Sequence, residues 1–387
     1  MSSAHILNVY EDLTLKLSQI FDLIDEISAG TLKNVQEKID GQNVTFTVDE
    51  TGKLLFFTKG ASHESFVRGT GADREELARK YAGNALLAES MISTYDVIQE
   101  CICSHPNATQ FFSEGKIFIE AAAVSPDCRN FIPYTRAAVV LIGTDGDLEV
   151  YEQIKESAIQ LSSLGTRPII EVPILFIEKA RTTKFASIKA KFYDLIRKQK
   201  IPLNGTVETL CVSLVSDFLR AKNLPKADLA AARLVRNEKR LLTKTMMKLS
   251  DWQRFQEFEN DRSLILSEAL LPFEKIVQSL GIAAFEQIQF KLGTTDDVVV
   301  ASLQYSIAQM RNAFVSGKIQ ADSKQKRQIA SALTRLGENG EVKFTKAVEG
   351  IVFVFQSHKL KLTGMFGPLN RLNSLFVYGK SPVRIIS

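Results

Sequence analysis

Lys38 is the residue whose type and setting best suit covalent chemistry. It lies in Glu37-Lys38-Ile39-Asp40-Gly41, a lysine followed by a tight Asp-Gly pair. A lysine amine attacks an electrophile only when it is deprotonated, so nearby cations are needed to lower its pKa. Asp40 could orient the amine, and Gly41 lets the backbone approach a ligand closely. The Lys-x-Asp-Gly pattern is short, and it is equally consistent with a surface turn that leads into a strand.

Two glutamates later in the chain could serve a nucleotide. Glu120 follows Phe118 and Ile119 in an apolar strand, where a carboxylate could bind a ribose hydroxyl. Glu349 precedes Gly350 and a second apolar strand, and hard cations such as Mg²⁺ prefer oxygen ligands of this kind. Taken alone, each glutamate is also consistent with a salt-bridged acid at a strand edge or start.

Lys359 and Lys361 are separated by one leucine in the segment Lys359-Leu360-Lys361-Leu362. Strand alternation places both lysines on one face and both leucines on the other. Two ammonium groups on one face could clamp a phosphate and lower the pKa of a neighbouring lysine. The alternative is an amphipathic edge strand whose lysines discourage aggregation.

The order of these four motifs resembles the covalent nucleotidyltransferase superfamily of DNA ligases, RNA ligases and capping guanylyltransferases. The run Glu-Lys-x-x-Gly-x-Asn from Glu37 to Asn43 is similar to RNA ligases of the bacteriophage T4 RNA ligase 2 type, although Phe46 comes one position late. Two other positions depart from the family. Ile119 stands where a glycine usually precedes the glutamate, and the next strand offers no aromatic residue for adenine, for which Tyr134 is the substitute we expect.

The resemblance implies a role for each residue of the first motif. Lys38 would take AMP from ATP, and Glu37 would read the adenine edge. Asp40 and Gly41 would complete the turn around the nucleophile, and Asn43 would serve the later steps of ligation.

The later motifs receive roles in the same way. Lys59 falls where the family places a basic residue near the ribose and phosphates, and Glu120 corresponds to the ribose-binding glutamate. Glu349 corresponds to the metal-site glutamate, while Lys359 and Lys361 correspond to the pair that contacts the α-phosphate. The expected cofactors are ATP and Mg²⁺.

The elements that must position these residues follow from hydrophobic periodicity. Strand-like alternation flanks a long stretch of helical pattern, which one short apolar strand interrupts. The expected helices cover residues 9–27 and 72–103 and most of 148–335, and the expected strands cover 44–48, 54–57, 116–124, 137–142, 168–177, 342–355 and 360–363. We therefore expect an α+β protein whose core is an antiparallel-sheet nucleotidyltransferase fold of the ATP-grasp-like ligase type. The expected domains are 1–150 and 336–387 for the core, with a mainly helical insertion at 151–335.

Positive charge is concentrated in the expected insertion. Residues 178–200 carry a net charge of +6 and residues 220–254 carry +7, so the rest of the chain carries −9 against a total of +4. Lys/Arg clusters of this kind suit a polyanionic partner, although a solvated helix face would look the same. The expected partner is RNA or a nicked duplex.

Composition excludes several other classes. The 4 cysteines form no CxxC pair, the 4 histidines lack metal-ligand spacing, and neither a dinucleotide fingerprint nor a Walker A motif is present. With no signal peptide or membrane-spanning run, we expect a cytoplasmic monomer, in host cytoplasm if the protein is viral. The 26 residues after Lys361 leave no room for a C-terminal OB domain, which favours an RNA-ligase-like enzyme. Two alternatives remain: a nucleotidyltransferase that modifies or caps another acceptor, and a non-catalytic nucleic-acid-binding protein on a degenerate ligase fold.

Overall fold

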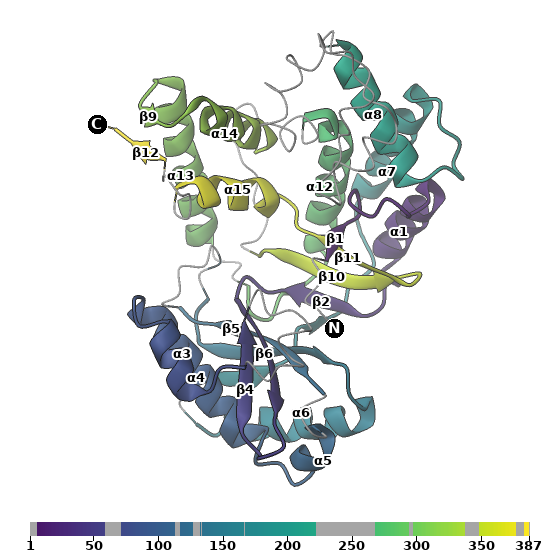
Figure 1. The fold of residues 1–387 in the computed structure, drawn as a ribbon. Coiled ribbons are helices and arrows are strands. Elements are labelled where there is room, and N and C mark those ends of the chain that lie inside the picture. The colour runs from purple at the N-terminus through teal and green to yellow at the C-terminus, as the bar shows by residue number, and fades with distance from the viewer. Residues whose placement is uncertain are drawn as a thin grey trace, which may run out of the picture. The chain divides into compact units, whose positions relative to one another are not determined.

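The chain divides into two compact units (Figure 1), which are described separately. Unit 1 comprises Met1–His5, Gln36–Leu175 and Phe290–Thr294, and unit 2 comprises Ile6–Val35, Phe176–Gln289 and Thr295–Ser387. The computed structural model describes residues 6–58, 71–112, 117–126, 132, 134–165, 167–221, 268–293, 297–336, 348–376 and 383–386.

Unit 1 is built on a five-stranded sheet with the order β4-β3-β5-β6-β7. All neighbouring strands are antiparallel except β6 and β7, which are parallel. Two short strands, β2 and β8, lie next to each other in a second sheet. The bounds are β2 (Val35–Lys38), β3 (Gln42–Val48), β4 (Leu54–Thr58), β5 (Ile119–Val124), β6 (Ala138–Thr144), β7 (Ile169–Glu171) and β8 (Ile174–Leu175).

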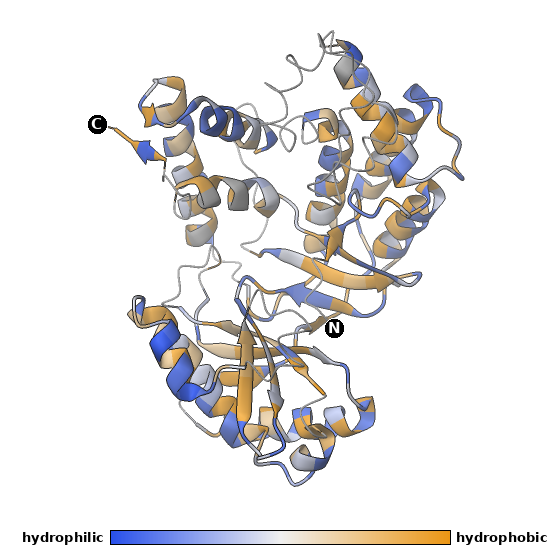
Figure 2. Ribbon diagram, viewed as in Figure 1, coloured by the Kyte–Doolittle hydropathy of each residue, from blue (hydrophilic) through white to orange (hydrophobic). Residues whose placement is uncertain are grey.

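Helices cover one face of this sheet because alternate residues of each strand are apolar. Val44, Phe46 and Val48 of β3 share a core with Ile119 and Ala121 of β5 and with the inner faces of the helices. Figure 2 shows the same strands as largely hydrophobic and the helices as a mixture of hydrophobic and hydrophilic residues. The helices of unit 1 are α3 (Arg74–Lys80), α4 (Ala85–Cys101), α5 (Ala108–Phe112) and α6 (Leu148–Ser162).

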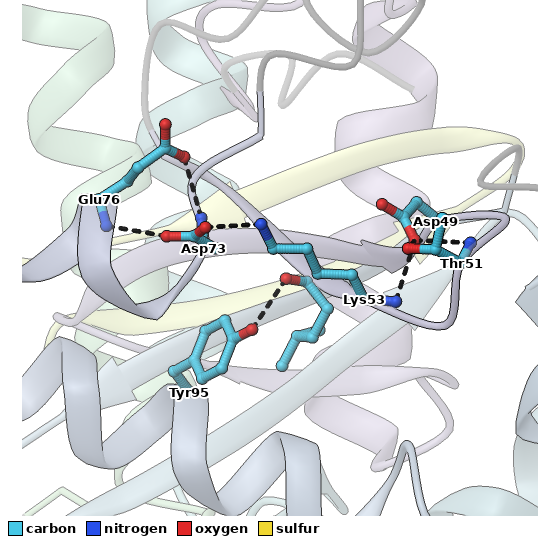
Figure 3. A network of polar contacts seen from close by, with 7 residues as sticks. Asp49, Thr51, Lys53, Asp73, Glu76 and Tyr95 are labelled. Atoms are coloured by element: carbon cyan, nitrogen blue, oxygen red, sulfur yellow. Dashed lines mark hydrogen bonds and ion pairs between the residues drawn. The ribbon is translucent and has the colours of Figure 1, made fainter.

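A polar network ties the β3–β4 hairpin to the helices (Figure 3). Asp49 closes the turn by accepting hydrogen bonds from the backbone N–H groups of Thr51 and Lys53, both at 2.9 Å. The Lys53 ammonium lies 2.6 Å from the carboxylate of Asp73, which caps α3. The Tyr95 hydroxyl of α4 donates to the carbonyl of Leu54 at 3.0 Å. The strands predicted at 44–48 and 54–57 are therefore confirmed, and they form a hairpin whose turn is fixed by side-chain hydrogen bonds.

Unit 2 contains the three adjacent strands β1, β11 and β10. Strands β10 and β11 form a hairpin in which Ile351 is opposite Leu362 and Phe353 is opposite Leu360, and all four side chains are fully buried. Strand β1 runs parallel to β11, and a two-stranded sheet joins β9 to β12. The bounds are β1 (Leu7–Asn8), β9 (Ile319–Gln320), β10 (Gly350–Phe355), β11 (His358–Leu362) and β12 (Arg384–Ile385).

Helices make up the rest of the described part of unit 2. Phe192 of α7 stacks on Phe273 of α12 with ring centroids 5.6 Å apart, and Phe21 of α1 packs against the same Phe192 ring at 5.0 Å. The bounds are α1 (Leu17–Ala29), α7 (Lys184–Lys198), α8 (Val207–Ala221), α12 (Leu271–Phe285), α13 (Asp297–Val315), α14 (Ser323–Arg335) and α15 (Phe366–Phe376).

A mixed helix and strand structure is compatible with the predicted α+β class, but several bounds differ from the prediction. Helix α1 begins at Leu17 and not near Val9, because Asp12 accepts the backbone N–H of Thr14 at 3.0 Å and forms a turn that competes with the helix. The boundary predicted at residue 150 falls inside unit 1, since Tyr151 and Ile154 belong to its core. Residues 222–267, which belong to the stretch 148–335 that is expected to be mostly helical, lie outside the described residues. None of the described helices is long and apolar enough to cross a membrane.

Candidate functional site

Lys38 is the last residue of β2, and the turn that follows it packs tightly against β5. A side chain at Gly41 would place its Cβ 2.7 Å from the Ala123 carbonyl oxygen and 2.9 Å from Val124 Cγ1. Only glycine therefore fits this position without moving the backbone, which gives Gly41 a structural reason independent of any ligand. The Lys38 side chain is half-buried, and it has polar or electrostatic contacts within the protein.

Asn43 and Glu120 lie on the sheet face opposite the core of unit 1. Asn43 is opposite Ala122 and Thr45 is opposite Glu120 in the antiparallel pair of β3 and β5. Because side chains alternate along a strand, Asn43, Thr45 and Glu120 share the face away from the core residues Val44 and Phe46. Asn43 is exposed and Glu120 is half-buried. The structure thus brings two predicted site residues to one surface.

A β-bulge marks the position of Glu120. Glu120 is opposite Gly143 and Ala121 is opposite Leu141, so Ile142 has no partner residue on β5. Gln36 of β2 donates through its side-chain amide to the Ile142 carbonyl at 3.5 Å, a long hydrogen bond. Gln36 and Lys38 lie on the same face of β2, because they are two residues apart. The face of β2 that carries Lys38 is therefore the one that meets the bulge beside Glu120, and bulges often aim side chains at active sites.

Asp40 is hydrogen-bonded to Ile132 and Tyr134. Its backbone N–H donates to the Tyr134 hydroxyl at 2.8 Å, and its carboxylate accepts the backbone N–H of Ile132 at 3.2 Å. Tyr134 is 4% exposed. The expectation that this ring stacks on adenine is wrong for this structure, because burial removes its faces from a ligand. Asp40 therefore links the turn after Lys38 to Ile132 and Tyr134.

Glu37 has a role that its motif does not predict. Its carboxylate accepts three successive backbone N–H groups, from Lys291 and Leu292 at 3.1 Å each and from Gly293 at 2.7 Å. The side chain is 4% exposed, and burial raises the pKa of Glu37, an effect that these three hydrogen bonds partly offset. The carboxylate thus binds the protein's own backbone. No short-range signal could have found this contact, because 254 residues separate Glu37 from Lys291.

The remaining motifs lie in unit 2, on the β10–β11 hairpin. Lys359 is opposite Val354 and Lys361 is opposite Val352, so both lysines share the face away from the buried Leu360 and Leu362, as predicted. They differ in environment, since Lys361 is 7% exposed whereas Lys359 is exposed.

Glu349 comes directly before β10 and is 8% exposed. No group of three or more histidine, cysteine or acidic side chains gathers at a metal-like site in the described part of the chain. Glu349 alone is nevertheless compatible with a nucleotide-bound Mg²⁺, which keeps several waters and takes one or two protein carboxylates. Lys59 lies outside the described residues, so its predicted role stays a prediction.

In unit 1, Asn43 and Glu120 therefore share one sheet surface, and Lys38 ends the strand whose Gln36 reaches the bulge beside Glu120. In unit 2, Lys359 and Lys361 share one face of the β10–β11 hairpin, and Glu349 directly precedes it. Comparison with known proteins found no matching family model, no matching curated protein and no matching solved structure.

Proposed function

We propose that this protein is an ATP-dependent polynucleotide ligase that works through a lysyl-AMP intermediate. The observation that carries the proposal is the position of Lys38 in unit 1. It ends β2 on the face that meets the bulge at Glu120, and the glycine turn after it leads into the strand that carries Asn43. A nucleophile, a ribose-binding acid and a polar residue for the later steps would then share one surface.

In the proposed first step, the Lys38 amine loses a proton and its nitrogen attacks the α-phosphorus of ATP. A phosphorus–nitrogen bond forms while the bond to the leaving oxygen breaks, so pyrophosphate departs and AMP stays on Lys38. AMP would then pass to a 5′-phosphate, and a 3′-hydroxyl would displace it to join two strands. Glu120 would accept hydrogen bonds from the ribose hydroxyls during the first step.

Lys359 and Lys361 would stabilise the charge that develops on the α-phosphate. Their shared face on β11 is the feature that supports this role. A buried ammonium group such as that of Lys361 interacts more strongly with a phosphate than an exposed one, because water screens it less. Glu349 would contribute one oxygen to Mg²⁺, which supplies additional neutralisation of the triphosphate when bound.

A nucleic-acid substrate is supported by the exposed side of α7. Lys184, Lys191 and Lys198 are seven residues apart, so they form one stripe along a helix whose opposite side packs into unit 2. Lys184 is paired with Glu286 at 2.6 Å, whereas Lys191 and Lys198 have no ion pair with a described residue. Tyr193, which is 51% exposed, lies on a different side of the same helix, because residues two positions apart on a helix do not face each other. The lysines along one side of α7 suit the phosphates of a nucleic-acid chain.

The first test is covalent labelling. We expect ATP labelled at the α-phosphate to label the wild-type chain and ATP labelled at the γ-phosphate to leave it unlabelled, because pyrophosphate leaves. Lys38→Ala should abolish the label, and Lys33→Ala, at an exposed lysine five positions earlier, should keep it. Labelling that persists in Lys38→Ala would contradict the assignment of the nucleophile.

The second test concerns the acceptor. Nicked duplexes and single strands of RNA and DNA, each with a 5′-phosphate and a 3′-hydroxyl, should be sealed by the wild-type chain with ATP. A chain that is labelled but joins none of these substrates would instead modify or cap a different acceptor.

A further inference from the structure

Glu37 joins two parts of unit 1 that are far apart in the sequence. Its three hydrogen-bond donors are consecutive backbone N–H groups, at 3.1, 3.1 and 2.7 Å, and its two carboxylate oxygens share them. Three converging N–H groups form an anion-binding concavity, which here holds a carboxylate of the same chain. The backbone of Glu37 is fixed as well, because its N–H donates to the Pro173 carbonyl at 2.6 Å.

The segment that supplies these donors is a short part of the chain that belongs to unit 1, although its neighbours in sequence belong to unit 2. Residues 290–294 are assigned to unit 1, whereas the residues on both sides, 176–289 and 295–387, are assigned to unit 2. Phe290 and Leu292 are each 6% exposed, so the segment is also anchored by apolar burial. The Glu37 carboxylate is the polar anchor of this excursion, which we call the 290–294 segment.

Because Lys38 directly follows Glu37, a fixed position of the Glu37 backbone limits the positions that the Lys38 backbone can take. Adjacent residues of a strand point to opposite faces, so the carboxylate and the Lys38 amine leave β2 on opposite sides. A backbone held at its amide by Pro173 and through its side chain by the 290–294 segment has little freedom to rotate. The starting point and direction of the Lys38 side chain are then set by contacts that touch no substrate.

We propose that Glu37 is a positioning residue whose carboxylate clasps the 290–294 segment and thereby holds the Lys38 backbone in place. The hydrogen bonds between the Glu37 carboxylate and the 290–294 segment do not depend on the proposed function, whereas their effect on the chemistry of Lys38 rests on it. Small misplacements of a nucleophile lower rates steeply, by about 100-fold for about 1 Å.

The test uses the full chain and three variants. Glu37→Ala removes both acceptor oxygens, and Glu37→Gln keeps one acceptor oxygen but adds an N–H donor that faces other donors. Asp49→Ala is the matched control, because Asp49 also accepts two backbone N–H groups, from Thr51 and Lys53, at a turn of the same unit. Circular dichroism checks that each variant folds.

Hydrogen–deuterium exchange measures directly whether the Glu37 carboxylate protects the amides of the 290–294 segment. We expect the amides of Lys291, Leu292 and Gly293 to exchange at least about 10-fold faster in Glu37→Ala, with Glu37→Gln intermediate and Asp49→Ala unchanged there. An unchanged rate in Glu37→Ala would overturn the clasp, and if that variant does not fold, the same outcome in Glu37→Gln would do so. This measurement needs no catalytic activity, so it remains decisive even if the wild-type chain fails to bind AMP.

The rate of labelling by α-labelled ATP measures how the substitutions at Glu37 affect the reaction of Lys38 with ATP. We expect about a 10- to 100-fold lower single-turnover rate in Glu37→Ala, with a smaller change in the ATP concentration that gives half the maximal rate. Faster exchange with an unchanged labelling rate would overturn the positioning role. A changed half-saturating concentration with an unchanged maximal rate would instead give Glu37 a role in ATP binding, which also contradicts positioning.

Discussion

Replacing Gly350 with alanine should destabilise unit 2 strongly, because no space exists for one added carbon atom. An ideal Cβ at this position would lie 2.1 Å from the Leu362 carbonyl oxygen and 3.0 Å from Thr363 Cα. Both are backbone atoms of the chain that pairs with β10, so a side chain cannot simply rotate away. Strands β10 and β11 would have to separate at this end, next to the pairing of Ile351 with Leu362.

Two contributions set the magnitude. Overpacking of a well-filled site costs about 1–3 kcal/mol, and a backbone angle φ of +156° adds a conformational cost for any residue with a Cβ. With about 1–3 kcal/mol for each contribution, they amount together to about 2–6 kcal/mol, which corresponds to a fall in melting temperature of about 4–24 °C for a unit of this size. Gly317→Ala is a control for a positive φ without a steric clash. Gly317 has a φ of +72° in the same unit, but an ideal Cβ there would have nothing within 4 Å, so only the conformational cost applies.

Thermal unfolding followed by circular dichroism compares the two variants with the wild-type chain. We expect Gly350→Ala to melt well below Gly317→Ala. Equal melting temperatures would refute the steric reasoning. The glycine of the Glu349-Gly350 motif would then need a different explanation, such as close approach to a ligand, and labelling by α-labelled ATP would show whether that ligand is a nucleotide.

Two further predictions use other contacts of unit 2. Asp12→Asn should lower the free energy of unfolding by about 1–3 kcal/mol at neutral pH, since Asp12 is 2.6 Å from His358 and also accepts from Thr14. Burial alone would raise the pKa of Asp12, but those contacts outweigh it and lower the pKa below 3.8, so urea titrations should show the wild-type advantage vanish as the pH falls below that value. Lys191→Glu with Lys198→Glu should weaken oligonucleotide binding and flatten its salt dependence in fluorescence anisotropy, leaving the rate of self-labelling unchanged. Unchanged affinity at low salt would exclude α7 as the contact surface.

Local patterns predicted the elements that neighbours in sequence determine. Alternation predicted the strands 44–48 and 54–57, which form the β3–β4 hairpin. The helix predicted to end at residue 27 ends at Ala29, where Gly30 has a φ of +70°, the left-handed cap that glycine adopts easily. The shared face of Lys359 and Lys361 followed from the two-residue period of a strand. Each of these inferences needs only a few consecutive residues.

Contacts between distant segments could not be predicted in this way. The Gln36 hydrogen bond to Ile142 spans 106 residues, and nothing near Gln36 indicates that partner. The division of the chain also differs from the predicted domains, because the packing of α6 against α4 assigns residues after 150 to unit 1. Hydrophobic periodicity shows that a helix has an apolar face, but it does not show which element covers that face.

Glu37 shows how such a long-range contact constrains a residue beside the candidate nucleophile. The alternation of β2 buries positions 35 and 37, where an apolar residue would avoid the desolvation that raises the pKa of Glu37. An apolar side chain there would, however, leave three backbone N–H groups of the 290–294 segment without their acceptor, and the buried N–H of Leu292 alone would cost about 1–3 kcal/mol. A hydrophobic substitution at residue 37 would therefore stabilise the buried position in β2 and destabilise the 290–294 segment. Consider a variant with an apolar residue 37 and a second replacement in the 290–294 segment that removes the N–H groups that need an acceptor. If the carboxylate only stabilises the fold, this second replacement should restore both folding and labelling. If the carboxylate positions Lys38, it should restore folding but not labelling.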